Sequence, residues 1–584
     1  MTTQTPQTTA PETHETTPVL PLPASAARLL TAAGAVAAFA STFLAWTWTE
    51  AFPGNLTVYG YPGGLQILTL VGSVLTALYV AAGHGIRGTR WAAPSGADKA
   101  TFFLAAGTFA VTWYTVLAIA VDLGGLVNLE PGGYIAALAT LVLLAGALGL
   151  PLNRRTLLAP GDTPPPPAGL SSTVEILLIA AGAGIGLTVF SYGIGTEYSE
   201  AFIGFLLLTI AGGLALSRAG LLVQFRTLTR KHRNIAVAAA FVAAALFPFT
   251  QTSETYTSVG TSILIFGTAA IGLNVVVGLA GLLDLGYVAF LGVGAYTAAL
   301  VSGAPTAAFD VKFPFWAAVL TGAVVSMIFG VIIGAPTLRV RGDYLAIVTL
   351  GFGEIFRIGM QNLDGASGPD VTNGPNGIPG IPEIELLGFN LGEEHTILGF
   401  ELGKFSNYLL LMLLFTAIIV TVFHRSDRSR IGRAWVAIRE DETAAGAMGI
   451  NTFRLKLMAF ALGATLAGLA GTVLAHVESG VHPEGYKFVH QVPPNSAFLL
   501  VAVILGGMGT ISGPLIGAAL LYLIPNKLQF VGDYQLLFFG IALVLLMRFR
   551  PEGLLADRRN QLEFHENEQT DVPENGSSLR KAGA

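Results

Sequence analysis

The feature that most constrains this chain is a succession of apolar stretches that are long enough to cross a lipid bilayer. The hydrocarbon core of a bilayer is about 30 Å thick, so one helical crossing needs roughly 20 mostly apolar residues. Only 11% of the 584 residues are charged, against about 25% in ordinary soluble domains. The sequence therefore predicts an all-α polytopic membrane protein.

We expect about 14 transmembrane helices and one re-entrant helix pair. The expected helices cover residues 24–48, 64–83, 101–121, 133–150, 173–193, 202–216, 235–250, 260–280, 286–303, 315–335, 343–360, 405–423, 456–476 and 534–549. A further apolar region at 497–525 is interrupted by "GGMGTISGP". The glycines Gly506, Gly507 and Gly509 predict a break between two half-helices, and a tight glycine turn between packed helices is the alternative.

Lysine and arginine gather in alternate loops, and this pattern predicts the orientation of the chain. The basic segments are 87–99, 154–155, 218–233, 339–341, 425–456 and the residues after 547. The loops between them are acidic or nearly free of cations. Because basic loops stay in the cytoplasm, we expect both termini there. A re-entrant pair at 497–525 keeps the last helix in agreement with this pattern, whereas one full crossing does not.

The chain divides by character into two parts and two polar tails. Residues 23–233 contain three similar hairpins, whose motifs "YPGGLQIL", "EPGGYIAAL" and "SEAFIGFLL" begin at residues 61, 130 and 199. This six-helix extension shows no intramembrane ionisable residue that suggests a transport path, so we expect a packing or assembly role. Residues 1–22 and 556–584 are polar and are predicted to be disordered.

Residues 234–555 contain polar groups within apolar segments, and such groups are costly in a membrane and tend to mark functional sites. Asn274, Asp284 and Glu354 are of this kind, although Asp284 could instead lie at a cytoplasmic turn. Arg357 follows Glu354 on the same helical face, so an internal ion pair is the alternative to a substrate contact. The candidate substrate-path residues are Asn274, Gly278, Asp284, Tyr287, Gly351, Glu354, Gly506, Gly507 and Gly509.

One polar segment, residues 432–460, stands between two apolar helices and is predicted to be cytoplasmic. Its charges would orient a docking partner, and its small residues would let another backbone approach closely. The charges are Arg433, Arg439, Glu440, Asp441 and Glu442, and the small residues are Ala444, Ala445, Ala447 and Gly449. An ordinary solvated loop is the alternative interpretation.

The sequence lacks the motifs of several function classes. No "GxxxxGK[ST]" phosphate-binding loop occurs, so the chain is not expected to bind ATP. It has no cysteine, no HExxH metal pair and no GxSxG nucleophile. We therefore expect no enzyme and no metal or cofactor bound by this chain, and transport is the function that remains.

Several ordered blocks resemble the signature of LivM-type permeases, the membrane subunits of branched-chain amino acid ABC importers. They include "GLNVVVGLAGLLDLGYVAFLGVGAYTAAL" at 272–300, "GAPTLRVRGDYLAIVTLGFGEIFR" at 334–357 and "TNGPNGIPGI" at 372–381. The resemblance continues at 428–475, in "LGGMGTISGPLIGAALL" at 505–521 and in "RFRPEGLL" at 548–555. The N-terminal extension lies outside it.

The resemblance implies a multi-pass permease subunit in a prokaryotic cell (inner) membrane that works with separate chains. A binding protein would deliver Leu, Ile or Val to the outer face, where the acidic loop 361–404 could receive it. A LivH-type permease would pair with this chain. Two cytoplasmic ATPase subunits would bind ATP and magnesium. We expect contact with membrane lipid and none with nucleic acid.

The ATPases of such importers press on a short helix with an EAA-like pattern, two alanines followed by a glycine at a fixed spacing. Here Ala444, Ala445 and Gly449 have that spacing. Thr443 replaces the usual glutamate, and Glu442 one residue earlier leaves the register open by one position.

Two other functions remain open from the sequence. The same architecture could import urea or short amides, since relatives with these solutes share the blocks. A secondary transporter or channel without ATPases is an alternative of another class, and it would leave the polar segment at 432–460 without a purpose.

Overall fold

The computed structural model describes residues 19–152, 170–338, 343–386, 388–397, 399–490, 493–528, 534–549 and 552–555. Its contacts divide the chain into two compact units, with the division after Phe247. From the sequence we expected the division after residue 233. The helix at 233–246 accounts for the difference, because it packs against helix 172–195 of the first unit. The tail at 556–584, most of the tail at 1–22 and most of the linker at 160–172 lie outside the described residues.

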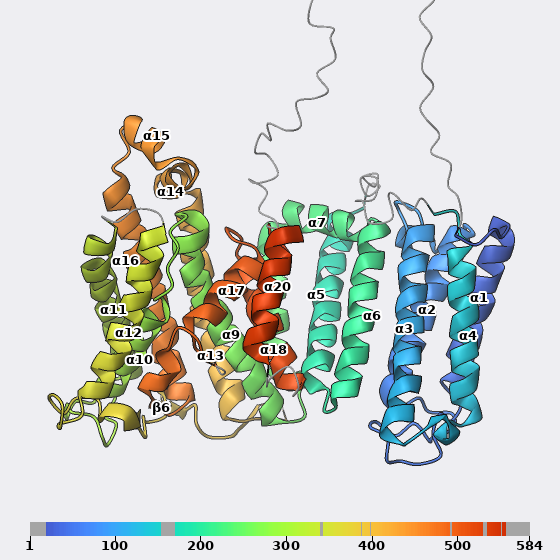
Figure 1. The fold of residues 1–584 in the computed structure, drawn as a ribbon, viewed down its shortest axis with the longest axis horizontal. Helices are drawn as coiled ribbons and strands as arrows, with labels where there is room; N and C mark the ends of the chain where they lie inside the picture. Colours follow the sequence, from blue (N-terminus) through green and yellow to red (C-terminus); the bar gives the residue numbers. More distant parts are fainter. Residues whose placement is uncertain are drawn as a thin grey trace, which may run out of the picture. The chain divides into compact units, whose positions relative to one another are not determined.

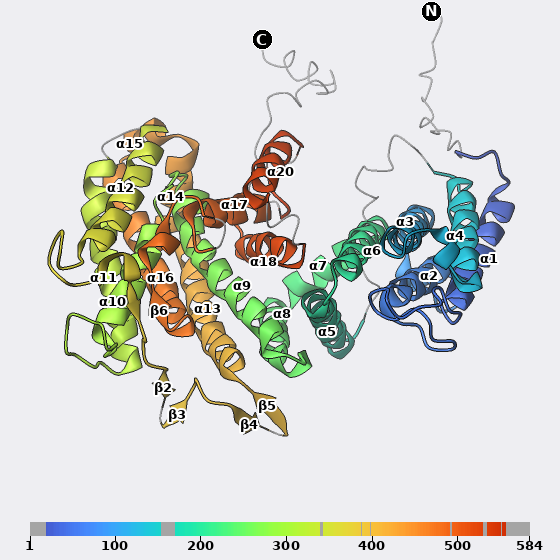
Figure 2. The same ribbon diagram turned by 60° about the horizontal axis from the view of Figure 1, so that its bottom comes forward.

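The expectation of an all-α polytopic membrane protein is confirmed. Among the described residues, ten helices are long and apolar enough to cross a membrane, and four further apolar helices are shorter. The few strands are two or three residues long and lie in loops. Figures 1 and 2 show helices as the main element of both units.

The first unit is built from helical hairpins that pack through small residues. Its helices are α1 (Ala24–Ser41), α2 (Gly64–Gly83), α3 (Asp98–Asp122), α4 (Pro131–Leu148), α5 (Ser172–Gly195), α6 (Ser199–Arg218), α7 (Leu221–Lys231) and α8 (Arg233–Leu246). A Cβ at Gly34 of α1 would collide with the backbone of Leu143 in α4. Such close approach suits helices that associate in lipid, where small residues favour packing.

Two segments of the first unit differ from the sequence expectation. The first helix ends at Ser41 and not at residue 48, because Trp46 turns the chain back and its indole Nε1 donates to the Ser41 carbonyl at 2.9 Å. Residues 221–231, expected as a basic loop, form the helix α7. Lys231 at its end and the following His232 both bind the buried Glu175 carboxylate, each at 2.7 Å.

The second unit contains the remaining helices. They are α9 (Glu254–Asn274), the π-helix η5 (Val275–Leu279), α10 (Val288–Val301), α11 (Phe315–Thr337), α12 (Asp343–Asn362), α13 (Lys404–Arg428), α14 (Arg430–Glu440), α15 (Glu442–Ala447), α16 (Thr452–Val477), η7 (Pro483–Tyr486), α17 (Ser496–Gly506), α18 (Ser512–Lys527) and α20 (Gln535–Phe549). The strands are β1 (Ile378–Pro379), β2 (Glu385–Leu386), β3 (Phe389–Asn390), β4 (His395–Ile397), β5 (Phe400–Leu402) and β6 (Gly480–Val481). β1 pairs with β6, β2 with β3 and β4 with β5, all antiparallel.

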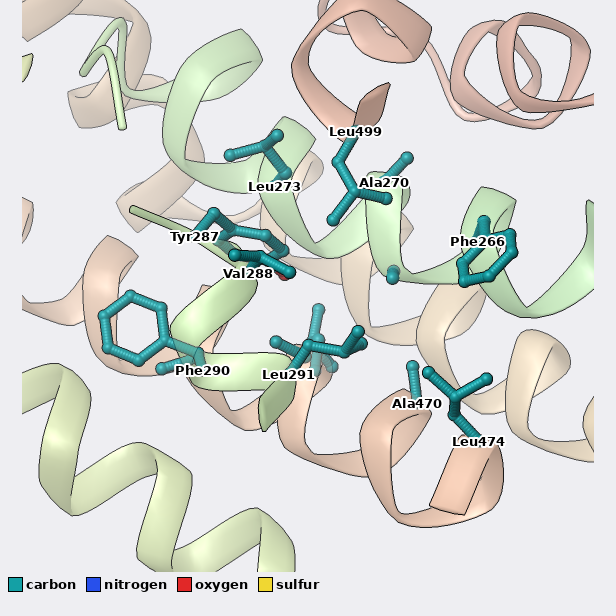
Figure 3. Packing of buried hydrophobic residues seen from close by; sticks show 14 of the residues in the cluster. Phe266, Ala270, Leu273, Tyr287, Val288, Phe290, Leu291, Ala470, Leu474 and Leu499 are labelled. Atoms are coloured by element: carbon teal, nitrogen blue, oxygen red, sulfur yellow. The ribbon is translucent and has the colours of Figure 1, made fainter. Parts of the chain in front are cut away.

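The core of the second unit lies where α9, α10, α16 and α17 meet. Figure 3 shows labelled side chains of α9 (Phe266, Leu273), α10 (Leu291), α16 (Leu474) and α17 (Leu499), which belong to one buried cluster. All these side chains are buried. The core therefore holds the N-terminal part of α10 against the end of α9, which is the region of the predicted substrate path.

The region at 497–525 forms two short antiparallel helices, α17 and α18, joined by a turn at 507–511. A Cβ at Gly506 would collide with Gly513, and one at Gly517 would collide with Ala502. Gly507 and Gly509 have φ values of +119° and +79°, which favour glycine in the turn. The predicted break at these glycines is therefore present, with two half-helices around it.

Candidate functional site: the coupling segment and the broken helices

The polar segment at 432–460 forms two short helices, α14 and α15, between α13 and α16. The starts of α14, α15 and α16 are each fixed by a side-chain cap. At α14, Ser429 Oγ accepts from Gly432 N at 3.1 Å, and at α16, Asn451 Oδ1 accepts from Arg454 N at 3.0 Å. Asp441 Oδ1 accepts from the backbone N–H groups of Thr443 and Ala444 at 2.8 and 2.9 Å. Such caps stabilise helix starts by about 1 kcal/mol each.

Figure 1 shows α15 at one end of the second unit, beyond α16, and β6 at the opposite end. α14 is fastened to α16 by Trp435, which is only 2% exposed and whose Nε1 donates to the Leu455 carbonyl at 2.7 Å. Glu442 pairs with Lys456 of α16 at 2.6 Å. The segment is therefore a fixed elbow on α16, hereafter the elbow (residues 430–451).

The residues predicted for docking divide into inward and outward groups. Ala445 is 4% exposed, so it packs within this chain and does not offer the close approach that we expected of it. Asp441 caps α15 and Glu442 binds Lys456, so these two charges are engaged locally. The outward residues are Arg433, Glu440, Thr443, Ala444, Gly446, Ala447, Met448 and Gly449.

Met448 was missed by the sequence interpretation, and it is 84% exposed at the end of α15. Gly449 follows it with φ +86°, and its N–H donates to the Gly446 carbonyl at 3.0 Å. This left-handed glycine ends the helix. The pattern "AAGAMG" could have drawn attention to Met448 as the one large apolar side chain among small residues.

Arg439 joins the elbow to the broken end of α9. Its Nη1 donates to the Gly278 carbonyl at 3.0 Å, and its Nη2 pairs with Glu440 at 2.9 Å. Gly278 lies in the π-helix η5, a form that often occurs at functional sites. Gly281 has φ +70°, and a Cβ there would collide with the Arg439 side chain. Two residues predicted separately, Arg439 and Gly278, are thus in contact.

Asn274, at the end of α9, holds the turn between α17 and α18. It is fully buried. Its Oδ1 accepts from Gly509 N at 2.9 Å, and its Nδ2 donates to the Thr510 carbonyl at 2.7 Å. A Cβ at Gly278 would lie 2.6 Å from Gly509 N. Asn274, Gly278 and Gly509 therefore form one contact group, and the Asn274 amide positions this turn.

We expect Asn274→Ala to weaken the packing of the turn at 507–511 on α9. The change leaves a buried N–H and a buried carbonyl without their partner, which costs about 1–3 kcal/mol for each group. The purified full-length chain should therefore lose thermal stability in detergent and show faster proteolysis near Gly509. Asn362→Ala is the matched control, because Asn362 is exposed at the end of α12 and its Nδ2 donates to the Ile358 carbonyl one turn earlier, so it should keep the wild-type stability. Equal thermal stability of Asn274→Ala and wild type would contradict this role.

The predicted glycines Gly506 and Gly507 also contact the C-terminal segment 552–555. Leu554 N donates to the Leu505 carbonyl at 2.8 Å, and Leu555 N donates to the Gly506 carbonyl at 3.0 Å. A Cβ at Gly507 would collide with the Leu555 carbonyl. Residues 552–555 thus close the end of α17, a pairing that the sequence did not indicate.

Asp284 and Tyr287 lie between η5 and α10, and both are buried. Asp284 Oδ1 accepts from Gly286 N at 2.9 Å, and its Oδ2 has no hydrogen-bond partner within the described residues. Within this chain Asp284 lies in the non-helical connection at 281–287, and its side chain is not solvated there. Tyr287 donates its hydroxyl to the Gly463 carbonyl of α16 at 2.9 Å. Both residues stand beside η5 and pack α10 against its neighbours.

Gly351 and Glu354 lie on α12, away from the Asn274 group. Gly351 is exposed, and no atom lies within 4 Å of the position of its Cβ. The expected ion pair between Glu354 and Arg357 is present, with Nε and Oε2 2.7 Å apart. Arg357 also reaches Glu484 of η7, at 3.4 Å. The nine predicted path residues thus fall into two sets. Seven lie around η5 and the turn between α17 and α18, and the other two, Gly351 and Glu354, lie on α12.

The chain was compared with known proteins. The family model described as branched-chain amino acid transport system / permease component matches residues 255–547. The high-affinity branched-chain amino acid transport system permease protein LivM of Salmonella typhimurium is 38% identical over 340 residues, which cover 56% of this chain and 76% of the relative. LivM of Escherichia coli is 37% identical over 346 residues, 57% of this chain and 77% of the relative.

A shorter match relates this chain to a second permease of the same kind of system. LivH of Escherichia coli is 31% identical over 138 residues, 23% of this chain and 42% of that protein. No solved structure gives a significant match. The matched range 255–547 contains the elbow, η5, α12 and the α17–α18 pair.

Proposed function

Because this chain belongs to the family of branched-chain amino acid transport permeases, we propose that it is the transmembrane permease subunit of an ATP-driven importer for Leu, Ile and Val. The observation that carries the proposal is the match to the two LivM proteins, of which the chain covers 76% and 77%. The chain itself is a multi-pass membrane protein and a transport subunit.

The partners follow from the architecture of such systems. A homologous LivH-type permease would pair with this chain, and the match to LivH supports a common ancestry of the two subunits. Two cytoplasmic ATPases would bind ATP and magnesium and dock on the elbow. A substrate-binding protein would deliver the amino acid at the outer loop. The first unit, which lies outside the matched range, would serve packing or assembly.

The mechanism would use the contacts that run inward from the elbow. Movement of an ATPase would displace α15 and α14, and Arg439 would pass this displacement to the Gly278 carbonyl in η5. The π-helix is joined to Asn274, which holds Gly509 and Thr510 of the turn between α17 and α18. A shift of η5 would therefore move the half-helices, and such two-state motion is how ABC permeases would alternate their access.

Uptake measurements test the function. Cells with this chain and its partners should accumulate radiolabelled Leu, Ile and Val in an ATP-dependent manner, and cells without this chain should not. Urea and short amides serve as competitors. Competition by excess urea and not by valine would favour the urea or amide alternative. Uptake that continues without any ATPase subunit would instead indicate a secondary transporter or channel.

The proposed orientation can be tested with single cysteines, because the natural sequence has none. Thr443→Cys on the elbow should react with a membrane-impermeant maleimide only after the cells are opened. Glu385→Cys in β2 should react in intact spheroplasts. The chain is expressed for this test without the proposed ATPase subunits, which would cover Thr443. Both positions are exposed in the chain itself, so a difference in labelling then reports sidedness and not burial. The reverse pattern would overturn the assignment of the elbow to the cytoplasm.

A further inference from the structure

A partly exposed ion pair lies on α12, a described helix that is not among the candidate membrane spans. α12 has 20 residues, and Glu354 lies about 16 Å from its start at a rise of 1.5 Å per residue. The Glu354 side chain is 40% exposed and that of Arg357 is 16% exposed. Charged groups are costly wherever they face lipid. This side of α12 must therefore face water or a protein partner.

The ion pair belongs to a network that has no net charge. Arg357 donates through Nε to Glu354 at 2.7 Å and through Nη1 to Glu484 at 3.4 Å. Gln361 Nε2 donates to the same Glu484 oxygen at 2.7 Å, and Lys487 pairs with Glu484. The bond from Lys487 lowers the pKa of Glu484, so this carboxylate is ionised at neutral pH. Two carboxylates and two cations thus balance one another.

Two atoms of the Glu354–Arg357 ion pair can still form hydrogen bonds to a ligand. Among the described residues, Arg357 Nη2 and Glu354 Oε1 make no hydrogen bond. One is a charged donor and the other a charged acceptor, and they belong to groups in direct contact. The α-carbon of a free amino acid likewise carries an ammonium and a carboxylate side by side. Charge-assisted bonds of this kind are among the strongest that proteins form.

The surroundings suit an aliphatic side chain. Ile358 follows Glu354 by one helical turn on the same face and is 46% exposed. Gly351 precedes Glu354 by one turn, and the space beside it is open. The layer beneath is aromatic, since Phe356 packs edge-on against Tyr296 and Tyr486. A charged pair thus lies beside an apolar surface with room for a branched side chain.

We propose that Glu354 and Arg357 bind the zwitterion of an aliphatic α-amino acid on the translocation path. Glu354 Oε1 accepts from the ammonium, Arg357 Nη2 donates to the carboxylate, and Ile358 and Gly351 contact the side chain. This inference rests on the proposed function and adds where the substrate is bound. Urea and amides carry neither charge, so the site discriminates against them.

Binding of radiolabelled leucine to the assembled permease–ATPase complex in nanodiscs, without binding protein, tests the site. Leucinamide lacks the carboxylate and 4-methylpentanoate lacks the ammonium, so both should compete more weakly than leucine with the wild type. Arg357→Gln should abolish the preference for leucine over leucinamide. Glu354→Gln should abolish the preference for leucine over 4-methylpentanoate. Each change should also weaken leucine binding on the order of tenfold to hundredfold. A purely structural ion pair would not alter these preferences selectively.

Two further variants keep the test independent of folding. Gly351→Leu, at an exposed helix position with open space, should weaken leucine binding more than alanine binding while the complex assembles normally. Glu50→Gln in the first unit makes the same chemical change as Glu354→Gln at an exposed loop position and should bind leucine as the wild type does. A wild-type complex that binds no leucine, or variants that lose all three ligands equally, would overturn the site. Absence of leucine uptake by the complete wild-type system would instead overturn the proposed function.

Discussion

Met448→Glu is expected to separate the ATPases from the permease and to reduce ATP-driven uptake to near background. Met448 is 84% exposed at the end of α15, where no other described large apolar side chain of α14 or α15 reaches comparable exposure. An exposed, flexible methionine among small residues is suited to fill a pocket on a partner. Central anchors of this kind cost 2 kcal/mol or more when removed, which is roughly a thirtyfold loss of affinity. Co-purification of the ATPases with the tagged permease measures the effect.

Met448→Leu is the matched control, because it keeps the apolar volume and should keep the association. Since Met448 contacts no buried core, both variants should accumulate in the membrane to the same level. Full recovery of ATPase subunits with Met448→Glu would show that the elbow docks through other residues. In that case a combined Ala444→Arg and Ala447→Arg variant would locate the contact on the exposed side of α15.

Arg439→Ala is expected to leave the ATPases bound but to reduce the amino acid transported per ATP hydrolysed, by about tenfold or more. Arg439 donates to the buried Gly278 carbonyl, and no other hydrogen bond to that oxygen is present beyond the backbone of the described helix. The variant removes the link between the elbow and η5, while the exposed face of α15 stays unchanged. Reconstituted vesicles allow uptake and ATP hydrolysis to be measured together.

Arg454→Ala is the matched control on the neighbouring helix α16. Arg454 is exposed and lies outside the elbow. It should therefore retain the wild-type ratio of transport to hydrolysis. Arg439→Lys should restore part of the ratio of transport to ATP hydrolysis. Its ammonium can reach the Gly278 carbonyl, but it has no second nitrogen to pair with Glu440. Parallel loss of transport and hydrolysis in Arg439→Ala would indicate an assembly defect and contradict a linking role.

Much of the fold could be predicted because the bilayer imposes simple rules on a chain. Each predicted transmembrane helix has a counterpart among the described residues, and the break at 506–509 separates α17 from α18. The Glu354–Arg357 ion pair was also predictable, since its two residues are three apart on one helix. The first helix was predicted too long because hydrophobicity extends beyond Ser41, and only the bond from Trp46 reveals the turn.

The sequence proposed the site residues, but their contacts could be read only from the structure. Asn274 was expected on the substrate path, but its amide is engaged by Gly509 and Thr510, which lie far from it in the sequence. Ala445 was expected to meet a partner, yet the direction in which α15 packs turns it inward. A one-residue step along a helix rotates a side chain by about 100°, so spacing alone cannot say which alanine faces out.

The sequence by itself determined that this chain spans a membrane many times, that its polar segment at 432–460 is a separate feature, and that glycines break the apolar region at 497–525. These properties depend on composition and local periodicity, which act over a few residues. Only the tertiary structure decided that Arg439 meets Gly278, that Asn274 holds the turn at 507–511, and that Met448 points outward from the elbow. Those contacts join residues far apart in the chain, and they exist because helix packing brings the joined segments together.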